Sequence, residues 1–133
     1  ELLMSVRGTT GIISVTSDVL EGANVTRGII PIRFNSKLVE RDFGYYAMLS
    51  HKIQKQISDA TYGAALQQIN VRDVKQIKIA IPAISEQKNI IDILSKIDKN
   101  LLLLERCSSQ KTANTNSLKS AILSQELQSS EAA

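Results

Sequence analysis

With 133 residues, 43% hydrophobic and 22% charged, the chain has room for about one small domain plus an extension, and it is not of the disordered class. A single cysteine, Cys107, excludes a disulfide framework within the chain, which fits the reducing cytoplasm. No apolar run reaches the ~20 residues that span a bilayer. The net charge of +3 lies wholly in residues 1–84, and this mild excess suits phosphate contact, although an ordinary solvated surface also carries it.

The first third of the sequence predicts three strands. Leu2–Arg7 and Ile12–Thr16 flank the turn Gly8–Gly11, whose paired glycines permit a tight or left-handed backbone. Residues Gly28–Phe34 alternate apolar and polar or proline side chains, which is the period of a half-buried strand. Because proline cannot donate a ladder hydrogen bond, Pro31 predicts an edge position for this strand.

Residues 42–58 change to helical spacing, and we expect one helix there. Its apolar face and its polar face separate cleanly. The apolar positions are Phe43, Tyr46, Ala47, Ile53 and Ile57, and the polar ones are Lys52, Lys55 and Gln56.

The segment that follows predicts short elements. Thr61–Gly63 breaks the helix, and Leu66–Ile69 predicts a short strand. Asn70 is placed to cap a brief helical turn, with Asp73 as the acidic partner of a capping box. Lys78–Ile81 predicts a last strand, closed by Pro82.

A long helix is predicted from Ser85, which suits the N-cap, with Glu86 in the favourable first turn. A heptad register of apolar positions follows, and about 40 helical residues would extend ~60 Å. The register comprises Ile90, Leu94, Ile97, Leu101, Leu104, Ser108, Lys111, Thr115, Leu118, Ile122 and Gln125. Its polar centre and the weak helix formers at 114–117 predict a bend or local fraying.

Such an apolar seam predicts a partner helix, either from a second copy of this chain or from another segment of a longer protein. The alternative is a helix packed on its own globular domain. A domain this small cannot easily cover a seam that long, so we expect helix pairing.

The sequence offers little for catalysis. The only histidine, His51, is far in sequence from Cys107, so we expect a surface histidine and a half-buried cysteine rather than a catalytic pair. No Cys and His spacing fits a zinc site, and no glycine-rich phosphate loop is present. We therefore expect no enzyme activity, no metal and no cofactor.

Several stretches, taken together and in order, resemble the specificity (S) subunit of type I restriction-modification systems. The first is the strand and turn Leu3–Gly11, with the pattern S-x-R-G-T-x-G. The others are Thr26–Gly28 with Ile32–Asn35 and Phe43–Leu49; Thr61–Ala64 with Gln68–Asn70; Ile81–Lys88 continuing to Ile90, Ile91, Leu94 and Asp98; and Leu118–Leu123. The resemblance covers the second half of a target-recognition domain and its spacer helix, so the upstream half is expected to be missing.

This resemblance implies an α+β fold: a partial target-recognition domain in residues 1–84, with a small twisted sheet and one or two helices, and a long coiled-coil-type spacer helix in residues 85–133. It implies sequence-specific binding of double-stranded DNA. It also implies assembly with methyltransferase (M) and restriction (R) subunits, which would carry the catalysis. The helix would pair, as a self-dimer or with a second spacer helix, through Ile90, Leu94, Ile97, Leu101, Leu104, Leu118 and Ile122.

Recognition of DNA needs cations for phosphates and polar side chains for base edges. The candidate residues are Arg7, Thr9, Thr10, Lys52, Lys55, Tyr62, Gln67, Gln68 and Asn70. Each also has a structural explanation, since glycine turns and asparagine caps are common and surface lysines are usually only solvated. Arg7 is the first candidate and Gln68 the second.

Two other functions remain open. The chain could be a protein–protein assembly or dimerisation module with no direct DNA readout. It could also be part of an enzyme completed by upstream residues, although it shows none of the catalytic side chains.

Overall fold

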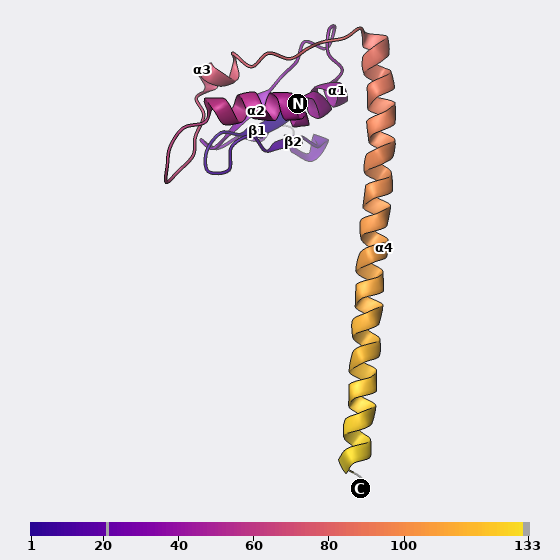
Figure 1. The fold of residues 1–133 in the computed structure, drawn as a ribbon. Helices are drawn as coiled ribbons and strands as arrows, with labels where there is room; N and C mark the ends of the chain where they lie inside the picture. The colour runs from indigo at the N-terminus through magenta and orange to yellow at the C-terminus, as the bar shows by residue number, and fades with distance from the viewer. Residues whose placement is uncertain (21, 132–133) are drawn as a thin grey trace. The chain divides into compact units, whose positions relative to one another are not determined.

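The computed structural model describes the backbone of residues 1–20 and 22–131, with side chains up to residue 123 except that of Asp18. The elements in chain order are β1 (Leu2–Ser5), β2 (Ile13–Val15), the 3-10 helix η1 (Asp18–Leu20), β3 (Ile29–Ile32), α1 (Arg41–Leu49), α2 (His51–Ala60), α3 (Val71–Val74) and α4 (Ile84–Glu131). A small antiparallel sheet, short helices and a long terminal helix confirm the expected α+β class (Figure 1).

The sheet has three strands in the order β2–β1–β3, and both pairings are antiparallel. In the register, Met4 of β1 lies between Ile13 of β2 and Ile30 of β3. The third strand lies at an edge, as Pro31 predicted, and its burial alternates with period two. The three predicted strands are therefore present, each slightly shorter than expected.

One face of this sheet forms the core together with α1 and α2, which lie against it (Figure 1). The core is aliphatic because the chain holds no tryptophan and few other aromatics. Its buried members are Leu2, Met4, Val6, Ile13, Met48, Ile53, Ile57 and Ile69. Burying such side chains stabilises each by roughly 1.5–3 kcal/mol.

The single helix predicted over 42–58 is two helices, because the chain is extended at Ser50 (φ −61°, ψ 145°). The Ser50 hydroxyl donates to the carbonyl of Ala47 at 2.7 Å, a local bond that competes with the continuing helix. The same residue caps α2, since its carbonyl accepts the amides of Ile53 and Gln54. The predicted apolar face is confirmed in part, since Phe43, Ile53 and Ile57 are buried whereas Tyr46 and Ala47 are only half-buried.

Two predicted strands do not form. In Leu66–Ile69 only Gln68 makes bridge contacts, and Lys78–Ile81 has no regular structure. A side chain takes the place of a neighbouring strand at Lys78. The Gln56 amide accepts from its N–H at 2.9 Å and donates to its carbonyl at 3.1 Å. Both backbone groups are thus satisfied without a ladder.

Asn70 does precede a short helix, α3, but its side chain makes no cap hydrogen bond. Its amide instead donates to the Asp73 carboxylate at 3.2 Å, so the predicted capping box is absent. The Asn70 backbone carbonyl accepts the amides of Asp73 and Val74 and begins the turn.

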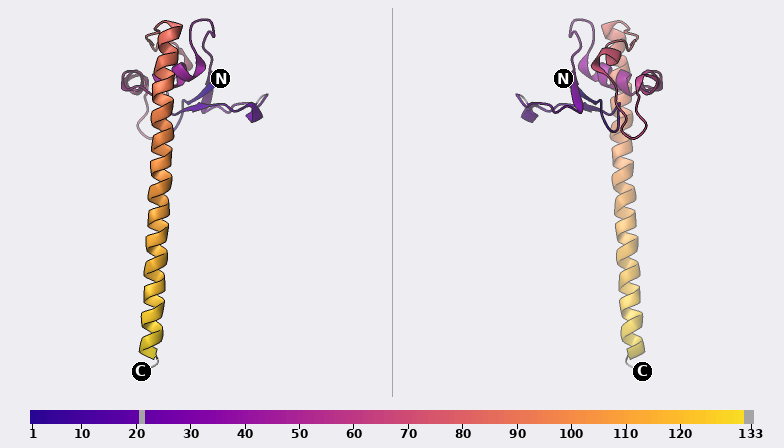
Figure 2. Two further views of the ribbon diagram at one scale, coloured as in Figure 1. Left: turned by 90° about the vertical axis from the view of Figure 1, so that its right-hand side faces the viewer. Right: turned by 90° about the vertical axis from the view of Figure 1, so that its left-hand side faces the viewer.

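The terminal helix α4 begins at Ile84, one residue before the predicted N-cap, so Ser85 lies inside its first turn with Glu86. It is unbroken through residues 114–117, where fraying was expected (Figures 1 and 2). Hydroxyls along this stretch donate to carbonyls of the preceding turn, which satisfies them inside the helix. These donors are Thr112, Thr115 and Ser120.

The chain forms two compact units, Glu1–Ile93 and the part of α4 from Leu94 onward. Among the described residues, no helix is long and apolar enough to cross a membrane.

Candidate nucleic-acid interface

The candidate site is a row of side chains beyond the end of β1. Arg7 and Gln68 form an isolated antiparallel bridge, and Gln68 forms a second one with Tyr62. Residues directly opposite in antiparallel chains project on the same side. The next residues, Val6 and Ile69, are buried in the core, so alternation turns Arg7, Gln68 and Tyr62 toward solvent. We call these three residues the Arg7–Gln68–Tyr62 row.

The geometry of the two bridges differs. The Ile69 amide donates to the Val6 carbonyl at 3.0 Å and the Gly8 amide donates to the Gln67 carbonyl at 2.8 Å. These hydrogen bonds lie on either side of Arg7 and Gln68, which form a non-hydrogen-bonded pair. In a non-hydrogen-bonded pair the Cα atoms are about 4.5 Å apart, closer than in a hydrogen-bonded pair, so these two side chains lie near each other. Tyr62 and Gln68 instead exchange backbone hydrogen bonds of 2.9 and 2.8 Å.

The Gly8–Gly11 turn places Arg7 at the end of its strand. Gly8 and Gly11 have φ of 80° and 82°, the left-handed conformation that the sequence predicted for them. The Ser5 side chain holds the turn closed, since its hydroxyl donates to the Thr9 carbonyl and accepts from the Ile12 amide.

The other half of the row depends on a tight loop over residues 62–68. Gly63 has φ of 101°, and a Cβ there would lie well under 3.0 Å from the carbonyl oxygen of Leu66. Only glycine therefore fits at this position, and it brings Gln68 back beside Tyr62.

A chain of hydrogen bonds extends the row. The Tyr62 hydroxyl donates to the Asn70 amide oxygen at 2.8 Å, and the Asn70 nitrogen donates to Asp73. Asn70 is two residues after Gln68, so its side chain projects to the same side, and the two hydrogen bonds fix the orientation of its side-chain amide. Each amide atom retains one further hydrogen-bonding position for an external group.

Beside the row, the turn faces α2 across a small polar pocket of about 230 Å³. Thr61 donates its hydroxyl to the Ile57 carbonyl at 2.8 Å, so Thr10 must be the donor in the 3.0 Å contact between the Thr10 and Thr61 hydroxyls. Gln67 also lines this pocket. The remaining turn candidate, Thr9, is exposed.

The two lysine candidates lie apart from this group. At 100° per residue, Lys52 projects from the side of α2 nearly opposite Gln54, which contacts the turn, and Lys55 projects about 100° round the helix from Gln54. Lys55 also pairs with Asp59 at 3.2 Å, with both side chains about two-thirds exposed. The structure therefore gathers seven of the nine candidates, all except these lysines.

Sequence reasoning missed two exposed arginines near the row. Arg27 precedes Gly28, whose backbone lies against Arg7: a Cβ added to Gly28 would lie 3.8 Å from the Cβ of Arg7. Arg72 follows Asn70 by two residues, in α3. Neither makes a side-chain hydrogen bond or ion pair that the described residues reveal. The signal was weak because each is a single cation, 20 to 65 positions from Arg7 in sequence.

The helix-pairing candidates form the second feature. Ile90 and Leu94 are half-buried, whereas the later ones are exposed. The exposed fractions are Ile97 47%, Leu101 53%, Leu104 66%, Leu118 66% and Ile122 58%. Cys107 is exposed too, so the expectation of a half-buried cysteine was wrong. It lies on the same helix.

Nothing in the described part of the chain forms a cluster of His, Cys, Asp or Glu able to hold a metal ion. His51 is exposed at the first position of α2.

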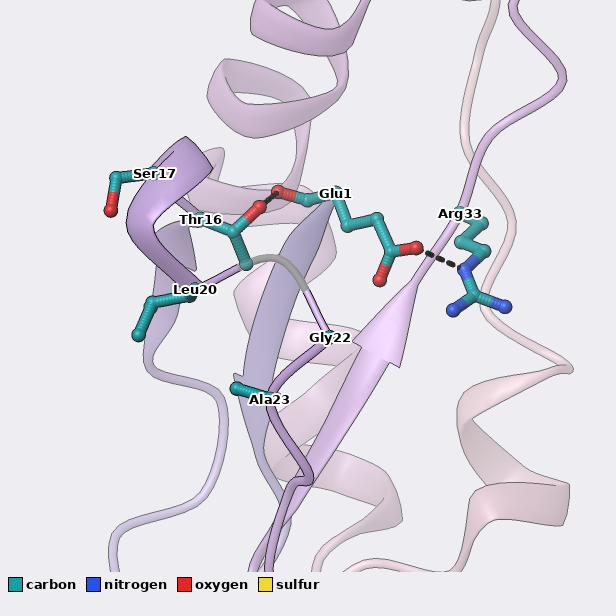
Figure 3. Close-up of a pocket in the computed structure, with 7 residues that line it drawn as sticks. All are labelled: Glu1, Thr16, Ser17, Leu20, Gly22, Ala23 and Arg33. Carbon is teal, nitrogen blue, oxygen red and sulfur yellow. Dashed lines mark hydrogen bonds and ion pairs between the residues drawn. The ribbon is translucent and has the colours of Figure 1, made fainter.

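A pocket of about 420 Å³ lies elsewhere and contains none of the DNA-binding candidates (Figure 3). Glu1 and Arg33 form an ion pair across it, and the Thr16 hydroxyl donates to the Glu1 carbonyl (Figure 3). The hydrogen bond from Arg33 lowers the pKa of the Glu1 carboxyl and raises that of the Arg33 guanidinium. This pair ties the residue before β1 to the residue after β3.

Comparison with known proteins gives one family. Residues 1–113 match the family model described as the type I restriction modification DNA specificity domain. No solved structure matches the chain significantly.

Proposed function

Because the chain belongs to the family of type I restriction modification DNA specificity domains, we propose that it is the specificity subunit, or a half-subunit, that reads a DNA sequence for such a complex. The observation that best supports this proposal is the Arg7–Gln68–Tyr62 row, in which Arg7 and Tyr62 are exposed and Gln68 is half-buried, held by two backbone bridges.

The row has the chemistry of a DNA contact. An arginine donates to phosphate or, bidentately, to guanine, and glutamine or asparagine pairs bidentately with adenine. Tyr62 adds a flat apolar surface with a hydroxyl already committed to Asn70. Backbone hydrogen bonds fix the row, so little ordering remains to be done when DNA binds.

The neighbouring candidates extend this surface. We assign Thr9, Thr10 and Gln67 to contacts beside the row, and Arg27 and Arg72 to the flanking phosphates. Lys52 and Lys55 lie on another side of α2, so any phosphate they meet belongs to a different part of the duplex. Residues 1–84 are then the recognition part, and residues 85–133 the spacer helix.

The exposed seam of α4 supports pairing with a second helix, from another copy or from another segment of a longer protein. Leaving five aliphatic side chains between 47% and 66% exposed along one face is unfavourable in water. In a specificity subunit, a pair of such helices would set the separation between two recognition domains and so the gap in a split DNA target.

The chemistry belongs to other subunits in this proposal. Methyl transfer and DNA cleavage would be carried out by methyltransferase and restriction subunits, and this chain would recognise the target DNA sequence. We propose that the complex acts in the cytoplasm.

The alternative is an assembly module whose helix pairs while the globular unit docks protein without reading DNA. It accounts for the exposed seam of α4 equally well. It gives no reason for an arginine, a glutamine and a tyrosine to be held in one solvent-facing row.

The test is selection from a random duplex library by the full-length protein assembled with methyltransferase subunits, followed by sequencing of the bound DNA. We expect one motif to be enriched, with binding that weakens as salt rises. A folded complex that enriches no motif would support the assembly module instead.

A further inference from the structure

Gln87, in the first turn of α4, is a polar side chain with no exposure at all. Its amide nitrogen donates to the carbonyls of Leu38 at 2.8 Å and Pro82 at 2.9 Å. Its amide oxygen accepts the backbone N–H of Glu40 at 2.9 Å. Both N–H bonds of the side-chain amide are therefore used, and its orientation is fixed.

These bonds join parts of the chain that are distant in sequence. Leu38 and Glu40 belong to the segment that leads into α1, and they precede Gln87 by 49 and 47 residues. Lys88 adds an exposed ion pair to Glu40 at 3.7 Å, and Ile91 lines a shallow pocket with Glu40. The first two turns of α4 thus meet this segment through positions on one helical face.

Burial alone would not require this chemistry. An apolar side chain of similar size would fill the same space without any polar group to desolvate. Three hydrogen bonds to three separate backbone groups do more, because they define both the distance and the rotation of the helical turn. Buried and fully satisfied polar groups select one arrangement in this way.

We infer that Gln87 is a positioning residue, which fixes the first turns of α4 to the segment before α1 so that the spacer helix starts from the recognition unit in one orientation. The inference rests on the proposed function, in which the geometry of the helix sets the gap in a split target. Gln87 touches no DNA in this account and acts through the helix.

The first experiment follows amide hydrogen exchange in the full-length protein carrying Gln87→Met, which has similar length and no amide. We expect the Glu40 amide, which loses its acceptor, and the amides of the first two turns of α4, which lose their anchor to Leu38 and Glu40, to lose protection by about tenfold or more. The amides of Gln68, in the Arg7–Gln68–Tyr62 row, and of the neighbouring core residue Ile69 should keep their protection. Gln110→Met, exposed on the same helix, is the matched control.

Uniform loss of protection across the row and the core would reduce Gln87 to a general stabilising residue and overturn the inference. If Gln87→Met does not fold, Gln87→Asn keeps the amide but shortens its reach by one methylene. It should then give a smaller loss of protection confined to the same amides. A Gln87→Asn protein with unchanged exchange at Glu40 would equally overturn the inference.

The second experiment uses the selected target in the assembled complex, with the gap between its two halves changed by one base pair either way. The wild type and Gln110→Met should prefer the natural gap, and Gln87→Met should lose most of that preference while still binding. A Gln87→Met complex with unchanged preference contradicts the inference alone. A wild type with no sequence preference contradicts the proposed function instead.

Discussion

Replacing Gly63 by alanine tests the loop that brings Gln68 beside Tyr62. Alanine at φ of 101° costs about 1–2 kcal/mol for the left-handed backbone. The added Cβ also meets the carbonyl oxygen of Leu66, a backbone atom that cannot move without opening the loop. Opening it breaks the two hydrogen bonds between Tyr62 and Gln68, at about 1 kcal/mol each. The expected loss is therefore about 3–4 kcal/mol.

Two other glycines provide matched controls. Gly8 and Gly22 have φ of 80° and 79°, and a Cβ at either would meet nothing within 4 Å. Each alanine variant should lose only the backbone cost of about 1–2 kcal/mol. Gly22 is remote from the row, so Gly22→Ala should leave DNA binding unchanged.

Urea unfolding gives the free energy of unfolding for each variant, and fluorescence anisotropy with the selected duplex gives its affinity. Gly63→Ala should be the least stable of the three and should lose specific binding even at temperatures where it is folded. If its stability lies within about 0.5 kcal/mol of Gly22→Ala, the close approach to Leu66 does not constrain the loop and the reasoning is refuted.

Three further predictions concern other parts of the chain. Arg7→Ala should weaken DNA binding and lower the slope of log affinity against log salt concentration by about one ion. Lys55→Ala should change both quantities less, because Lys55 already pairs with Asp59 and lies away from the row. Equal effects of the two substitutions in a salt titration would argue against DNA contact by the Arg7–Gln68–Tyr62 row. Gly44→Ala should destabilise the fold by about 1–3 kcal/mol, because its Cβ would overlap the ring of Phe34; thermal unfolding measures this, and an unchanged melting temperature would show that the ring moves freely. The double substitution Leu101→Lys and Leu104→Lys should abolish pairing of α4 while the globular unit stays folded, and light scattering of the full-length protein would detect the loss of pairing. Helix pairing is contradicted if the wild type is monomeric at high concentration with α4 formed and has no second long helix of its own.

The strands and helices with strong periodicity could be predicted from the sequence. Alternation identified β3 and its edge position through Pro31, and the heptad spacing identified α4. These patterns reflect burial on one face, which a single sequence displays directly. The two glycines of the Gly8–Gly11 turn were likewise recognisable from their spacing.

Two of the failures have a common cause, because in each a side chain took over a backbone hydrogen bond. Ser50 ended one helix and capped the next, and the Gln56 amide replaced a strand partner at Lys78. Neither pairing leaves a periodic signal. The buried Gln87 could not be anticipated either, because its three partners lie in loops that only the tertiary fold brings together.

The candidate site was predicted in part. Arg7, Tyr62 and Gln68 were chosen separately, from a turn, a helix break and a run of amides. The bridge that joins Arg7 to Gln68 is a long-range pairing between positions more than fifty residues apart, which spacing cannot predict, and the bridge between Tyr62 and Gln68 closes a short loop. Lys52 and Lys55 were chosen for their charge and for their place on the polar helix face, and neither feature says whether that face lies beside Arg7.

The most direct test of the account is the base preference of a Gln68→Ala complex, obtained by the same library selection as for the wild type. The row predicts that preference relaxes at one or two adjacent positions, with the rest of the motif and the salt dependence retained. A motif identical to that of the wild type at every position would contradict the claim that the Arg7–Gln68–Tyr62 row reads DNA.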